Sequence, residues 1–358
     1  MARSTFSTLA RRRASPAPNE CATWSTIGSA APVLQVWFSS RIRPASGSGR
    51  DRLGFQKNST RSNARWLPEG QFAQVAGLAT TRAQDLTMHR RHTAAPPLTS
   101  LIRCFWYWEG APLSHARERL LPNGEAAIIF NLRDDEMRIY DADDPLRYTS
   151  CGLVAITGPR TNCFAIDTAA EERVIGIQFH AGGTFPFFRE PAAEVANQSV
   201  ALDCLWGPRA ALIREQLLAA ASVDAMFALL ERALLAHLAR PLELHPAVAF
   251  ASGRICRAPH ATTIAGVTQR IGISQRRFID LFRDQIGLTP KAFCRVRRFQ
   301  RVLEAVHRRQ SVDWVQVALD GGYYDQAHLI HDFQDFSGMT PTAYLDKATE
   351  HLNHVPMH

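Results

Sequence analysis

The chain has 358 residues, of which 46% are hydrophobic and 21% charged, a balance typical of a soluble globular protein rather than a disordered or fibrous one. No run of about 18 apolar residues predicts a transmembrane helix, so no membrane partner is expected. Seven cysteines lie scattered without a Cys-x-x-Cys pair, which argues against a disulfide framework or a zinc site and indicates a reducing, cytoplasmic compartment.

The positive charge is unevenly distributed along the chain. Residues 1–87 hold 12 Lys+Arg and 4 Asp+Glu, residues 88–244 hold 15 and 19, and residues 245–358 hold 14 and 10. The net charge of +8 therefore equals that of the first segment alone. For this reason the basic composition does not by itself indicate nucleic-acid binding.

Residues 1–87 are rich in Arg, Ser, Ala and Pro and show no sustained helical or strand period. Three interpretations stay open for them: a disordered tail, a transit peptide, and an extension that is foreign to the native protein. In the last case Met88 would serve as the start, because strand-like sequence follows shortly after it.

Residues 88–206 predict a β-rich sensor domain, because short apolar runs alternate there with Gly, Pro, Asp and Asn. Residues 121–125 have the composition of a turn. Many short strands separated by turns suit a small cupin-like barrel. The aromatic run at 105–108 either packs in a strand core or lines a ligand pocket. Strands are predicted at residues 101–108, 126–132, 137–140, 152–157, 163–166 and 174–179.

Residues 207–244 predict a helical connector. Apolar residues recur at helical spacing over 208–240, and Ser222 can cap the second of two antiparallel helices. Such a pair packs either on its own barrel or on a second copy of the chain, so a homodimer is one expected partner.

An internal repeat is the most informative feature of the sequence. Residues 282–293 match residues 333–344 at an offset of 51, with Phe, Asp, Gly, Thr, Pro and Ala in common. Upstream, Gly272 corresponds to Gly322 at an offset of 50. The sequence therefore predicts two copies of one supersecondary unit.

Each copy has the pattern of a helix-turn-helix. Ser274 can cap a second helix that extends to about residue 285, and the equivalent helix of the second copy extends over about 325–336. Gly272 and Gly322 suit turns with positive φ, and Gly287 and Gly338 suit helix ends. One long helix over about 291–308 would join the copies. Its expected buried stripe consists of Phe293, Val296, Phe299, Val302, Leu303 and Val306.

Three motifs resemble the AraC/XylS family of transcription regulators: Gly-Ile-Ser-x-Arg-x-Phe at 272–278, Gly-Leu-Thr-Pro at 287–290, and Gly-Gly-Tyr-Tyr-Asp-Gln-Ala-His at 321–328. The resemblance implies an all-α domain of two helix-turn-helix units over 245–346, followed by a tail at 347–358. It also implies that the two recognition helices enter successive major grooves of double-stranded DNA. The whole chain is then a multi-domain α+β protein.

The resemblance also implies which exposed residues face the bases. Arg276 can form a bidentate pair with guanine, Gln326 can pair with adenine, and Ile279 can touch a thymine methyl group. Asp280 is less expected beside DNA, where it would accept from cytosine or orient a neighbouring arginine. The full set of expected contact residues is Gln275, Arg276, Ile279, Asp280 and Arg283 in the first unit, and Gln326, Ala327, His328 and His331 in the second.

Other functions have weaker support in the sequence. His328, His331 and Asp332 have metal-compatible spacing, and His180 is a lone candidate ligand, but DNA contact or simple exposure suits them better. No catalytic motif occurs, so we expect neither an enzyme nor a cofactor. The prediction is a sequence-specific regulator with a small-molecule effector and RNA polymerase as further partners. The alternative is a β-barrel small-molecule-binding protein or enzyme with an accessory nucleic-acid-binding domain.

Overall fold

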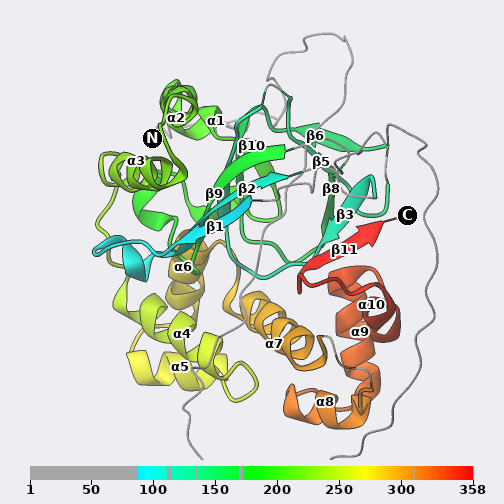
Figure 1. The fold of residues 1–358 in the computed structure, drawn as a ribbon. Coiled ribbons are helices and arrows are strands. Elements are labelled where there is room, and N and C mark those ends of the chain that lie inside the picture. Colours follow the sequence, from blue (N-terminus) through cyan, green and yellow to red (C-terminus); the bar gives the residue numbers. More distant parts are fainter. Residues whose placement is uncertain are drawn as a thin grey trace, which may run out of the picture.

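The computed structural model describes residues 88–357, apart from residues 111–114, 134, 145, 169–171, 308 and 310. The three interpretations of residues 1–87 lie outside this range. A β-rich part is followed by a helical part that lies against one end of it (Figure 1). Among the described residues, no helix has both the length and the apolar character to cross a membrane.

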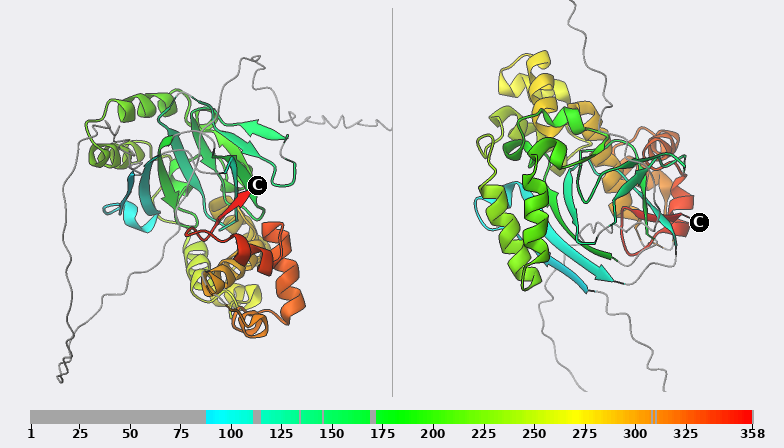
Figure 2. Two further views of the ribbon diagram at one scale, coloured as in Figure 1. Left: turned by 45° about the vertical axis from the view of Figure 1, so that its right-hand side comes forward. Right: turned by 90° about the horizontal axis from the view of Figure 1, so that it is seen from above.

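Two antiparallel sheets make up the β-rich part, and this confirms the predicted fold class (Figures 1 and 2). Each of the six predicted strands is present, whereas the first, third, sixth, tenth and eleventh strands were not predicted. The six-stranded sheet contains, in spatial order, β1 (Met88–His92), β2 (Ile102–Gly110), β9 (Glu172–Phe179), β4 (Ala127–Asn131), β7 (Val154–Thr157) and β10 (Ser199–Ala201). The five-stranded sheet contains β11 (His354–Met357), β3 (Arg117–Leu120), β8 (Phe164–Asp167), β5 (Arg138–Tyr140) and β6 (Tyr148–Ser150).

The inner strands β2, β4 and β7 of the six-stranded sheet are buried on both faces, which explains their nearly continuous apolar sequences, whereas the edge strand β1 is mostly exposed. Along β2, Phe105 and Tyr107 belong to the core beneath the connector, whereas Trp106 and Trp108 belong to the core between the sheets. This alternation follows from the two-residue period of a strand. The Trp106 indole lies so close to Gly176 that a Cβ there would be 2.2 Å from the ring. The aromatic run is therefore core packing.

The connector helices cover the outer face of the six-stranded sheet (Figure 2). The side chain of Ser222 accepts a hydrogen bond from the Ala225 amide, as the predicted cap requires. Phe227 and Leu230 then pack into the sheet core. The segment comprises α1 (Asp203–Trp206), α2 (Arg209–Leu218) and α3 (Val223–Leu235), and three 3-10 turns, η1 (Leu98–Ser100), η2 (Phe185–Phe187) and η3 (Ala192–Val195), precede it.

Seven helices make up the described helical part. The long helix α7 buries all six residues of the stripe predicted for it. The first helix of this part was not predicted, although it packs against α6 and α7. The helices are α4 (Pro246–Arg257), α5 (Ile264–Ile271), α6 (Gln275–Ile286), α7 (Pro290–Val306), α8 (Trp314–Asp320), α9 (Gln326–Ser337) and α10 (Pro341–Lys347).

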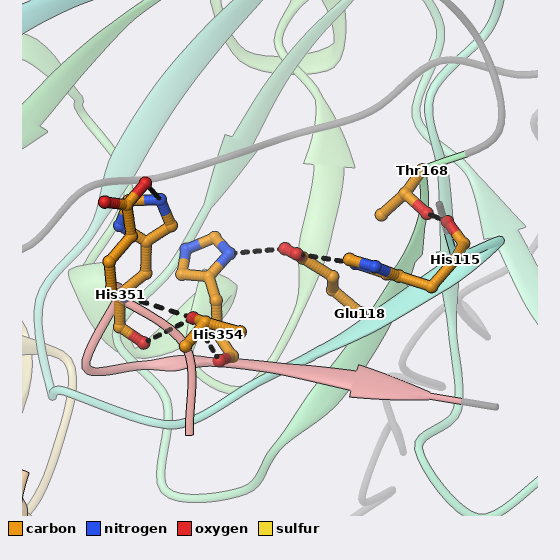
Figure 3. A network of polar contacts seen from close by, with 7 residues as sticks. His115, Glu118, Thr168, His351 and His354 are labelled. Carbon is orange, nitrogen blue, oxygen red and sulfur yellow. Dashed lines mark hydrogen bonds and ion pairs between the residues drawn. The ribbon is translucent and has the colours of Figure 1, made fainter. Parts of the chain in front are cut away.

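The expected tail at 347–358 instead contains strand β11, which pairs with β3 of the β-rich part. His354 of β11 and His115 lie on either side of the Glu118 carboxylate, at 2.7 and 2.8 Å from its two oxygens (Figure 3). Burial raises the pKa of Glu118, but the charge and hydrogen bond of His354 and the hydrogen bond of His115 outweigh it and lower the pKa overall. Local sequence patterns missed this strand because its partner lies more than 200 residues away.

We expect the C-terminal segment to make the stability of the folded chain sensitive to acid. Burial, and then the neighbouring His354, lowers the pKa of His351 from 6.5 to about 3. Between these values the unfolded chain binds a proton that the folded chain excludes, so stability falls as the pH decreases. Each such histidine contributes up to about 1.4 kcal/mol per pH unit.

We therefore expect the urea concentration at the unfolding midpoint to decrease as the pH is lowered from about 7 to about 5. The His351→Gln variant should show a smaller decrease. His89 would keep part of the dependence, because burial lowers its pKa to about 4. His331→Gln is the control, since that side chain is 74% exposed. An unchanged slope in His351→Gln would contradict the role given to this residue.

Candidate nucleic-acid interface

The first helix-turn-helix consists of α5, a tight turn and α6. Thr263 caps α5 by accepting from the Gly266 amide, and Ser274 caps α6 by accepting from the Arg277 amide. Between the helices Gly272 has a φ of 68°, which residues with a Cβ rarely adopt. Phe278 and Phe282 bury the inner face of α6. The outer face of α6 therefore has a fixed orientation.

The second helix-turn-helix repeats this construction with α8 and α9. Asp313 caps α8 through the amides of Val315 and Gln316. Asp325 caps α9 by accepting from the His328 amide at 2.7 Å. Gly322 has a φ of 75°, and a Cβ there would lie 2.3 Å from the Cβ of His260. Here the glycine satisfies both the turn and a close approach between the two units.

The expected contact residues lie on the outer faces of α6 and α9. Seven of the nine are exposed, while Ile279 and His328 are half-buried. The His328 ring packs edge-on against Tyr323, at 5.2 Å between centroids, which restricts its reach. Contact of these side chains with bases stays a prediction.

Two alternative roles, Asp280 as the group that orients a neighbouring arginine and His331 as a metal ligand, gain no support from the geometry of the described residues. Within the described chain, Asp280 forms no ion pair with Arg276 or Arg283, so it does not orient them here. His331 pairs with Asp335 at 3.8 Å. In the same described ranges, no group of three or more His, Cys, Asp or Glu is placed to hold a metal ion.

A cleft of about 510 Å³ lies between the two units, with α7 as its floor. Lys291, Arg295 and Arg298 line this floor, and His331 lines the wall that α9 provides. Because the three floor cations recur at helical spacing, one face of α7 presents them together. Cations in this position suit the phosphates that run between two major grooves.

The buried carboxylate of Asp332 fixes α9 to α7. Arg295 donates to one carboxylate oxygen at 2.6 Å, and Arg298 lies 3.9 Å from the other. Arg295 also donates to Asp335 at 3.0 Å, and these bonds raise the pKa of the Arg295 guanidinium. Asp332 is 2% exposed, whereas the Arg295 side chain is 35% exposed, so the carboxylate is buried and the guanidinium still reaches solvent. Sequence analysis did not identify Lys291, Arg295 and Arg298 as a contact group, although their spacing was a usable signal.

The opposite face of α7 contacts the β-rich part. Gln300 donates to the Pro122 carbonyl and to the Asn353 side chain, both at 2.8 Å. Arg297 donates to the Asn123 carbonyl at 3.4 Å and lies 3.8 Å from the Glu125 carboxylate. One helix thus contacts the inter-unit cleft on one side and the β-rich part on the other. Sequence analysis could not anticipate these contacts, because they join residues far apart in the chain.

Comparison with known families gives one match in the β-rich part and another in the helical part. Residues 90–201 match a family described as a domain of unknown function (DUF6597), and residues 267–347 match a family described as a helix-turn-helix domain. No curated protein matches the chain.

Several solved structures are similar to parts of the chain. The C-terminal domain of AraT from Geobacillus stearothermophilus is 18% identical over 29% of this chain and 87% of its own, with a TM-score of 0.27. A probable AraC family transcriptional regulator from Rhodopseudomonas palustris is 25% identical over 29% and 98%, with a TM-score of 0.27. ToxT from Vibrio cholerae is 10% identical over 68% and 99%, with a TM-score of 0.39. Structural similarities with such low TM-scores support no conclusion about function.

The family match covers both recognition helices and the helix between them. It also covers the residue motifs at 272–278, 287–290 and 321–328 that resemble one family of regulators. Residues 267–347 of this chain therefore belong to the helix-turn-helix domains of the AraC type.

Proposed function

We propose that the chain is a sequence-specific transcription regulator whose helices α6 and α9 enter successive major grooves of double-stranded DNA. The observation that supports this most strongly is the pair of equivalently capped units on α7. Each unit buries the inner face of its second helix and exposes polar side chains on the outer face. This is how helix-turn-helix proteins present side chains to base edges.

The two recognition helices offer different base chemistry. Arg276 is exposed and has no ion-pair partner among the described residues, so both of its terminal nitrogens are available to a guanine. Gln326 is exposed at the start of α9 and suits an adenine. Ile279, half-buried on α6, offers an apolar surface to a thymine methyl group. Arg283 and the floor of the inter-unit cleft would contact phosphates.

Regulation would reach the DNA-binding units through α7. The β-rich part holds this helix through Gln300 and Arg297, so a small-molecule effector that moves residues 121–125 would also move α7. A second copy of the chain is the partner that we propose for the connector, where Leu212 is 57% and Leu235 41% exposed. RNA polymerase is a further proposed partner.

Arg276 provides the direct test of sequence reading. Selection from a random DNA pool with the unmodified chain defines its preferred site. We expect Arg276→Ala to lose the preference at one or two base pairs of that site, at a cost of about 1–3 kcal/mol. Arg147→Ala, in the hairpin between β5 and β6, removes the same charge from an exposed position outside the helical part and should leave the site unchanged. An intact preference in Arg276→Ala would show that α6 does not present this face to the bases.

Arg283 tests the phosphate contacts separately. Because a phosphate contact is independent of sequence, Arg283→Ala should weaken binding to all duplexes by a similar factor. The plot of log affinity against log salt concentration should become shallower by about one unit, since one fewer counterion is released. A changed sequence preference with an unchanged salt slope would instead assign Arg283 to base contact.

A further inference from the structure

A cavity of about 50 Å³ lies between the two sheets, next to the junction with the helical part. Its walls are mainly apolar and come from both sheets, including Ala127, Ile129 and Phe164. Because one water needs about 10–15 Å³ of such volume, the cavity has room for about four waters. Residues of the 121–125 segment, together with Asn353 and His354, also line the cavity. The cavity is thus small, largely apolar and adjacent to α7.

Arg160 is a buried cation in the wall of this cavity. It is 7% exposed, and it donates to the Asn197 carbonyl and to the Ser199 hydroxyl, both at 2.9 Å. Its guanidinium lies 4.2 Å from the centre of the Phe164 ring. Its Nε has no hydrogen-bond partner, and no carboxylate of the described residues forms an ion pair with it. Every described partner of this cation is therefore neutral.

An uncompensated buried charge costs several kcal/mol, because the low-dielectric interior replaces its hydration. Burial lowers the pKa of Arg160 to about 10, so the side chain still keeps its charge at neutral pH. Hydrogen bonds to a carbonyl and a hydroxyl need a donor but not a cation, since a neutral amide could make them. The Phe164 ring attracts the positive charge, but no anion among the described residues balances it.

The carboxylate in the cavity wall belongs to Glu125, and it does not fill this role. Arg103 donates to both of its carboxylate oxygens, and Arg297 approaches from the other side at 3.8 Å. Two cations thus already balance this carboxylate, whereas Arg160 has no such counterpart in the described structure. An anion that entered the cavity would meet one unbalanced positive charge and an apolar wall.

We infer that the cavity binds a short aliphatic carboxylate, whose carboxylate group pairs with Arg160 and whose carbon chain packs against the apolar wall. This rests on the proposed function and gives the chemical class of its effector. Guanidinium and carboxylate have matching planar geometry, so the pair gains both charge compensation and hydrogen bonds. The limited volume selects acids of a few carbon atoms.

The position of the cavity gives the ligand a route to the DNA-binding units. Asn353 borders the cavity and also accepts from Gln300 of α7. His354, at the start of β11, borders the cavity and contacts Glu118 (Figure 3). A bound acid would thus touch the residues that hold α7 and β11 against the β-rich part.

Calorimetric titration of the full chain with propanoate and butanoate tests this, with propanamide and butanamide as neutral analogues of equal shape. We expect the acids to bind at least about tenfold more tightly than the amides, because only they compensate Arg160. Arg160→Gln should abolish this difference. Arg117→Gln is the matched control, since Arg117 is already paired with Asp167 at 3.2 Å. Equal binding of acids and amides, or unchanged acid binding by Arg160→Gln, would overturn the proposal.

A second variant separates ligand binding from folding, since Arg160 also supports residues 197–199. Ala127→Leu fills the cavity and leaves Arg160 in place, so it should abolish acid binding while circular dichroism reports a folded chain. Retained acid binding in this folded variant would overturn the proposal. DNA selection without acid tests the proposed function separately. If the chain selects a DNA sequence but binds no acid, only the proposed ligand is wrong. If the chain binds acid but selects no DNA sequence, only the proposed regulator function is wrong.

Discussion

The buried stripe of α7 is the constraint on which the arrangement of the two recognition helices depends. Phe293, near its start, packs against Phe282 of α6 at 5.8 Å between ring centres, and Phe299, six residues later, packs against Phe333 of α9 at 5.2 Å. The helix has 17 residues and is therefore about 25 Å long. Because both cores share this one rigid element, neither recognition helix can turn without disturbing the packing of α7. The spacing of the two outer faces is thus set by a hydrophobic core that does not itself contact DNA.

The polar faces of the same helix separate two tasks. Lys291, Arg295 and Arg298 face the inter-unit cleft, whereas Arg297 and Gln300 face the β-rich part. Residues two positions apart on a helix point in nearly opposite directions, so a displacement on one side is transmitted to the other through the backbone. This geometry gives a physical route between a cavity in the β-rich part and the outer faces of α6 and α9. The buried His354–Glu118 contact of β11 provides a second connection between the same two parts.

Local features of this chain could be predicted from sequence, and features that depend on distant contacts could not. The caps at Ser222 and Ser274, the positive φ of Gly272 and Gly322, and the stripe on α7 all follow from residues near one another in the chain. The internal repeat predicted the rest of the candidate interface, because each residue assigned in one copy identifies its equivalent in the other. Strand β11, the isolation of Arg160 and the attachment of Gln300 to Pro122 join segments separated by tens to hundreds of residues. Short periodicity contains no signal for such contacts.

We propose that one chain places α6 and α9 in two successive major grooves. Hydroxyl-radical footprinting of the full chain on its selected DNA site tests this most directly. The account predicts two protected regions on one face of the duplex, with centres about 10–10.5 base pairs apart. In the Arg276→Ala variant only the region under α6 should weaken. A single protected region, or protection that weakens equally in both regions, would contradict the account.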